Sequence, residues 1–117
     1  MRDNILIDKT ISFAARIIKL NQYLVKDKKE NIISKQIVRS GTSIGANINE
    51  ANYGQSKAGF ISKLHIALKE TAETEYWLRL LVLSDYITEN EGNSLINDCI
   101  EIKRILISTL NPAKQNS

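Results

Sequence analysis

The side chains able to bind a metal or act as a nucleophile are few and far apart. His65 is the only histidine and Cys99 the only cysteine. A helical di-iron centre requires a glutamate three residues before a ligand histidine, but Ser62 occupies that position. Zinc needs more ligands than His65 and Cys99 supply. We therefore predict no metal, with His65 at the surface or its boundary and Cys99 as an inert thiol on an apolar helix stripe.

The segment 40–45, which reads SGTSIG, is the nearest approach to a catalytic or phosphate-binding loop. No strand precedes it, as a nucleophile elbow requires, and it lacks the Gly-Lys-Ser/Thr ending of a phosphate loop. Glu70 and Glu73 share a helix face, but no further group converges on them. We interpret Glu70 as solvated and Glu73 or Glu75 as the partner of a basic residue. The sequence predicts no enzyme, no cofactor and no small-molecule substrate.

Positive charge is concentrated in the first third of the chain. The net charge is +3, yet residues 9–39 hold eight basic residues against Asp27 and Glu30. Such asymmetry is typical of proteins with a polyanionic partner, although charged faces also serve solubility. Four of these residues follow one drifting stripe of a helix, with no acidic residue three or four positions away in that helix. The candidate nucleic-acid-binding residues are Lys9, Arg16, Lys19 and Lys26 on this stripe, continued by Lys28, Lys29 and Lys35.

Apolar residues recur with a period near 3.6, and no segment alternates as a strand does. We predict one all-α domain, an antiparallel up-down-up-down four-helix bundle with helices at about 8–26, 30–53, 57–84 and 89–110 and a tail at 111–117. Asp8 is the expected N-cap of the first helix. No apolar run is long enough for a signal peptide or a membrane span, so we expect a cytoplasmic protein without membrane contact. The expected inner stripe of the first helix comprises Ile11, Ala14, Ala15, Ile18 and Leu24.

Two features point to a homo-oligomer. Gly41 and Gly45 stand four residues apart and leave a bare patch on the second helix, which indicates close packing of another backbone. That backbone belongs either to the same subunit, in a tight crossing, or to another subunit. The third helix is apolar nearly all round from 76 to 83, more than one core covers. The candidate interface residues are Gly41, Gly45, Tyr76, Trp77, Leu80 and Leu83.

The segment Arg39 to Ala51 resembles the second-helix signature of a family first noticed as proteins encoded in intervening sequences of bacterial 23S rRNA genes. The similarity continues through Phe60 to Glu70 and Glu73 to Leu78, and covers essentially 8–110. This resemblance implies a bundle that assembles into a ring, typically a pentamer, in a bacterial cell and without established catalysis. A relative, the accessory variability protein of diversity-generating retroelements, resembles a basic pentameric barrel that binds nucleic acid and a reverse transcriptase.

Two functional hypotheses follow from these observations. The first is a non-enzymatic, self-assembling bundle that contacts RNA or DNA through its basic face. The alternative is a scaffold or protein-interaction ring, for example a reverse-transcriptase accessory protein, without nucleic-acid binding of its own. Salt-dependent RNA binding separates them, because affinity that comes from phosphate neutralisation falls steeply with salt.

Overall fold

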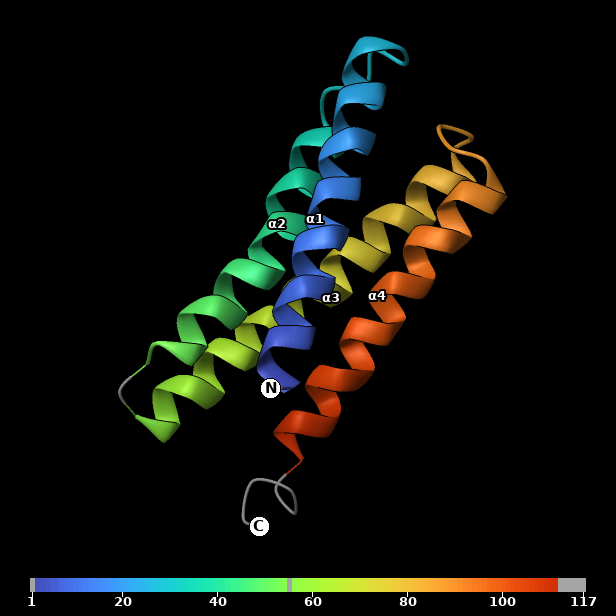
Figure 1. The fold of residues 1–117 in the computed structure, drawn as a ribbon. Helices are drawn as coiled ribbons and strands as arrows, with labels where there is room; N and C mark the ends of the chain where they lie inside the picture. The colour runs from blue at the N-terminus through green and yellow to red at the C-terminus, as the bar shows by residue number, and fades with distance from the viewer. Residues whose placement is uncertain (1, 55, 112–117) are drawn as a thin grey trace.

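Four antiparallel helices make up a computed structural model that describes residues 2–54 and 56–111. They are α1 (Arg2–Lys26), α2 (Ile33–Asn52), α3 (Lys57–Leu83) and α4 (Glu89–Leu110). Figure 1 shows them running alternately up and down, and the described ranges contain no strand. The predicted all-α bundle is confirmed. After Asn111 the predicted tail lies outside the described residues. Among the described helices, none has an apolar stretch that could span a bilayer.

The helices do not pack equally against their neighbours. α2 lies between α1 and α3 and contacts both extensively, and α3 contacts α4 to a similar extent. α1 and α4 contact each other over far fewer residues. Figure 1 shows these two helices moving apart toward the end of the bundle where α1 ends. The bundle, about 48 Å long, therefore has one loosely closed side.

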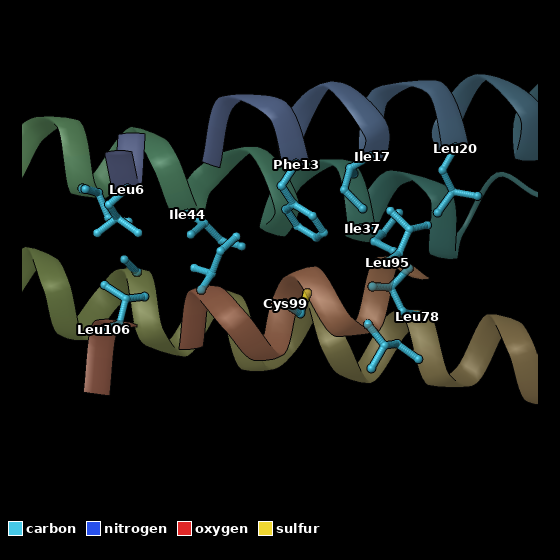
Figure 2. Close-up of a cluster of buried hydrophobic side chains, with 14 of the residues drawn as sticks. Leu6, Phe13, Ile17, Leu20, Ile37, Ile44, Leu78, Leu95, Cys99 and Leu106 are labelled. Carbon is cyan, nitrogen blue, oxygen red and sulfur yellow. The ribbon is translucent and has the colours of Figure 1, made fainter. Parts of the chain in front are cut away.

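The core runs along the bundle axis and receives large aliphatic side chains from every helix. Figure 2 shows Ile17 of α1, Ile37 and Ile44 of α2, Leu78 of α3 and Leu106 of α4 directed into this space. Each of them is fully buried. Burial of side chains of this size contributes roughly 1.5–3 kcal/mol each, so the core holds the helices in their relative positions.

The predicted inner stripe of α1 is wrong in all but one position. Leu24 is buried, whereas Ile11 is 61% and Ile18 is 43% exposed. Ala15 is exposed and Ala14 half-buried. The helix carries two apolar stripes, and periodicity alone does not say which one faces inward. The stripe with the larger side chains is the buried one, and it comprises Leu6, Phe13, Ile17, Leu20 and Leu24 together with Thr10.

Two predicted helix starts also differ from the structure. α1 begins at Arg2, so Asp8 lies inside the helix rather than at its N-cap. α2 begins at Ile33 instead of residue 30, and the Glu30 carboxylate accepts hydrogen bonds from the backbone amides of Ile33 and Ser34 at 2.9 and 2.7 Å. Burial alone would raise the pKa of Glu30, but these amides outweigh it and hold the pKa below its ordinary value. The ends of α3 and α4 agree with prediction to within one residue.

Candidate nucleic-acid interface

One face of α1 carries a stripe of polar and basic residues beside α4. Counted along the helix, they are spaced alternately by three and four residues, which keeps them on one side of it. Lys9 Nζ lies 2.9 Å from Glu101 Oε1, and the Arg16 guanidinium forms an ion pair with Asp98. Acidic residues of α4 therefore neutralise the first half of the stripe. We call this set the basic stripe: Lys9, Ser12, Arg16, Lys19, Tyr23 and Lys26.

The second half of the stripe keeps its positive charge. Five exposed lysines gather where α1 ends, through the following turn and into the first turn of α2. Within the described residues, none of them forms an ion pair with a carboxylate. Among the acidic residues nearby, the Glu30 carboxylate caps α2, Asp27 is exposed and Glu91 lies across from Lys19 on α4. This lysine cluster comprises Lys19, Lys26, Lys28, Lys29 and Lys35.

A groove opens beside this cluster, where α1 and α4 diverge. Its volume is about 540 Å³. Arg16, Lys19 and Tyr23 form the α1 wall, and Asn90 and Ser94 belong to the opposite wall on α4. Tyr23 was not among the predicted site residues, although its spacing of four from Lys19 and three from Lys26 places it on the basic stripe. We call this space the Tyr23 groove.

A second groove of about 410 Å³ lies at the other end of the α1–α4 contact. Its charged lining is mainly acidic, because Asp8, Asp98 and Glu101 surround Lys9. The two grooves therefore differ in charge, and the basic stripe changes character near Arg16. Only the end that holds Tyr23 suits a polyanion.

Gly41 and Gly45 pack against α1 of the same chain. A Cβ atom at Gly41 would lie 2.9 Å from Ile17 Cγ2, and one at Gly45 would lie 2.8 Å from Thr10 Oγ1. The tight crossing within one subunit is therefore what the structure contains at these positions. Gly41 is buried inside the chain, which removes it from the candidate oligomer interface.

The glutamates of α3 are engaged in ion pairs. Arg39 Nη1 lies 3.0 Å from Glu70 Oε2, and its Nη2 lies 2.6 Å from Glu73 Oε2. Trp77 Nε1 donates to the same Glu73 oxygen at 3.1 Å. The bonds from Arg39 and Trp77 hold the pKa of Glu73 below its ordinary value. The prediction that Glu70 is solvated is wrong, because Arg39 pairs with both carboxylates and ties α2 to α3.

Glu75 links α3 to α4 in the same manner. The Lys103 ammonium donates to it at 2.8 Å, and Arg79 donates to its other oxygen at 2.8 Å. The hydrogen bond from Lys103 is the main cause that lowers the pKa of Glu75. The predicted pairing of Glu73 or Glu75 with basic residues is confirmed for both. These carboxylates have structural partners on neighbouring helices.

Exposed apolar side chains form a patch on α3 and another on α1. The α3 patch consists of Tyr76 and Leu83, which are 60% and 82% exposed, together with the half-buried Trp77 and Leu80. The α1 patch follows the outward stripe of α1, at a spacing of seven residues. Ile11 and Ile18 were predicted to lie in the core, so this outward patch was not expected. Its members are Ile11, Ile18 and Val25.

Cys99 and His65 lie on different helices, one buried and one exposed. Cys99 is buried in α4, and its burial raises the pKa of the thiol to about 12. His65 is exposed on α3. In the described part of the chain, no three histidine, cysteine, aspartate or glutamate side chains are placed to share a metal ion. Cys99 therefore behaves as a small core residue, as predicted.

Comparison with known proteins gives a consistent family relationship. A family model described as 23S rRNA-intervening sequence protein matches residues 2–108. A solved structure from Bacteroides thetaiotaomicron, described as a protein with unknown function from the S23 ribosomal protein family, is 55% identical. It superposes with a TM-score of 0.92 and covers 94% of this chain and 98% of its own. No protein with a curated description matches the chain.

Proposed function

Because the chain belongs to the family of 23S rRNA-intervening sequence proteins, we propose that it is a non-enzymatic, cytoplasmic bundle that assembles into a ring and binds RNA or DNA. The lysine cluster makes the contact. The ribosomal family name of the Bacteroides protein favours RNA as the polyanion. The ring contributes by repeating a modest patch several times on one particle.

The observation that supports nucleic-acid binding is that no lysine of the cluster forms an ion pair with a carboxylate of the described residues. A lysine held by a carboxylate gains little from a phosphate, because it must exchange one anion for another. Lysines that face water release counterions from the nucleic acid when they bind it, which drives association. Several copies on a ring act together on one long strand.

The test measures RNA binding by fluorescence anisotropy between about 50 and 200 mM salt. We expect Lys19→Gln with Lys26→Gln to weaken binding and to reduce the salt slope by roughly 0.7 to 0.9 per lysine. The matched control is Lys69→Gln with Arg104→Gln, two exposed residues of α3 and α4, which removes equal charge outside the cluster. Equal losses in both double variants would assign binding to net charge. Failure of the wild type to bind at low salt would overturn the proposal in favour of the scaffold alternative.

The proposed ring rests on the existence of two different apolar patches. A cyclic assembly larger than a dimer joins one surface of each subunit to a different surface of the next. The α1 patch and the α3 patch lie on helices whose backbones do not approach each other in the bundle, so these helices occupy diagonal corners. Contact between the α1 patch of one subunit and the α3 patch of the next would close such a ring.

Light scattering tests this arrangement. The wild type should have a mass several times 13.2 kDa, and Ile18→Glu or Leu83→Glu should each reduce it to the monomer. A mixture of these two variants should form heterodimers, since one intact α3 patch still meets one intact α1 patch. Tyr53→Glu, at an exposed turn, is the control and should leave the assembly intact. A monomeric wild type would contradict the proposal, as would Ile18→Glu dimers held by α3 alone.

A further inference from the structure

We propose that the Tyr23 groove receives an unpaired base from a single-stranded nucleic acid, with a neighbouring phosphate beside Lys19. This inference rests on the proposed nucleic-acid binding and specifies which form of nucleic acid the protein selects. The groove volume of about 540 Å³ lies within the range of ordinary ligand pockets. Its lining offers aromatic surface, an apolar floor and positive charge in one place.

The apolar part of the groove suits the faces of a base. Leu20, Ile87 and Leu95 line it and are themselves almost fully buried, so they form a fixed floor. Tyr23 stands at the edge and is 38% exposed. Bases of single strands stack on aromatic side chains, and this contact tolerates any sequence because every base has a flat face. Tyr23 is therefore the side chain that we expect to stack.

The charged part of the groove suits a phosphate. Arg16 is held across the groove, with its guanidinium on Asp98 and its Nη2 donating to Ser94 Oγ at 2.9 Å. Lys19 has no such partner among the described residues. Glu91 also lines the groove and keeps its negative charge, but its carboxylate is held in the cap of α4, where it accepts from Thr88 Oγ1 at 2.9 Å.

Positive charge also lies over the aromatic ring. Lys28 Nζ is over one face of the Tyr23 ring, 5.9 Å from its centre as in a cation–π contact, so a base would stack on the opposite face. Alternation of cations with an aromatic ring matches the alternation of phosphate and base along a single strand. A duplex keeps its bases stacked and paired inside, so it would reach the lysine cluster but not the Tyr23 groove. The groove should therefore distinguish single strands from duplexes.

The experiment compares a fluorescent single-stranded RNA of about 20 nucleotides with the duplex of the same sequence, using the intact protein. We expect Tyr23→Ala to weaken single-strand binding roughly 5- to 100-fold and to leave duplex binding unchanged. Tyr23→Phe keeps the ring and should bind like the wild type. Tyr53→Ala removes a tyrosine from the α2–α3 turn that is 81% exposed, more than Tyr23, and should have no effect. Because Tyr23 is partly exposed, these variants should remain folded, which circular dichroism checks.

The outcomes separate this inference from the proposed function. If the single strand binds and Tyr23→Ala behaves like Tyr53→Ala, the lysine cluster binds nucleic acid but the groove does not hold a base. Equal loss of duplex and single-strand affinity would also overturn the base site. If Tyr23→Ala changes the oligomer mass instead of RNA affinity, a second copy of the chain covers the groove. If the wild type binds neither RNA at low salt, the proposed function itself fails.

Discussion

Helix α1 makes two contacts of opposite character. Toward α2, glycines leave so little space that a single added carbon would collide with Ile17 or Thr10. Toward α4, long charged side chains such as Lys9 and Arg16 span the distance to Glu101 and Asp98. Small residues let backbones approach and exclude water, whereas charged pairs keep their ends in water and hold helices apart. One contact of α1 therefore serves stability, and the other leaves room for a ligand.

The largest effect on stability is expected at the close contact between α1 and α2. Gly41→Leu places a branched side chain against Ile17, whose own branched carbon restricts its movement. We expect the free energy of unfolding to fall by about 1–3 kcal/mol or more, measured by urea denaturation. Ala46→Leu on the exposed side of α2 is the control and should change little. A more stable Gly41→Leu protein would mean that α1 and α2 can move apart without loss of stability. This would contradict the conclusion that their close contact stabilises the fold.

Acidification should have a smaller effect on stability. It tests whether the carboxylates of α3 stabilise the contacts of this helix with α2 and α4. The pKa values of Glu73 and Glu75 are lowered by their hydrogen bonds from Arg39 and Lys103. A carboxyl with a lowered pKa in the folded state stabilises the fold above the unfolded value of 4.5, and loses this effect as pH falls through the folded value. The melting temperature should therefore fall below pH 4.5, and less steeply in Glu73→Gln. An identical pH profile in that variant would contradict the assignment.

The helices differ in how well the sequence predicts their bounds and their inner faces. The bounds of α3 and α4 were predicted to within one residue, because Ser56 and Thr88 cap these helices locally. α1 has two apolar stripes of equal period, and only packing against the other helices distinguishes them. Gly41 indicated a close approach, but local spacing does not identify the approaching backbone.

The candidate site shows the same limit. Sequence placed the basic residues on one face of α1, because spacing within a helix fixes their direction. It did not predict that Asp98 and Glu101, more than 80 residues away, neutralise Arg16 and Lys9. The Tyr23 groove likewise depends on how far α1 and α4 diverge, which no local pattern encodes. Tyr23 itself could have been predicted from the sequence, because its spacing places it on the basic stripe.

The smallest change in stability is expected at the contact between α1 and α4. There the change in RNA affinity is more informative than the change in stability. Asp98→Asn removes the partner of Arg16 beside the Tyr23 groove. The two side chains of this ion pair are 42% and 40% exposed, so the free energy of unfolding should change by only about 0–1 kcal/mol. RNA affinity should rise roughly two- to fivefold, because Arg16 keeps its bond to Ser94 while a negative charge leaves the site.

Glu50→Gln is the matched control, since Glu50 forms a similar exposed pair with Lys63 away from the groove. Equal gains in the two variants would reduce the effect to net charge, whereas weaker binding in Asp98→Asn would mean that Asp98 positions Arg16 for the ligand.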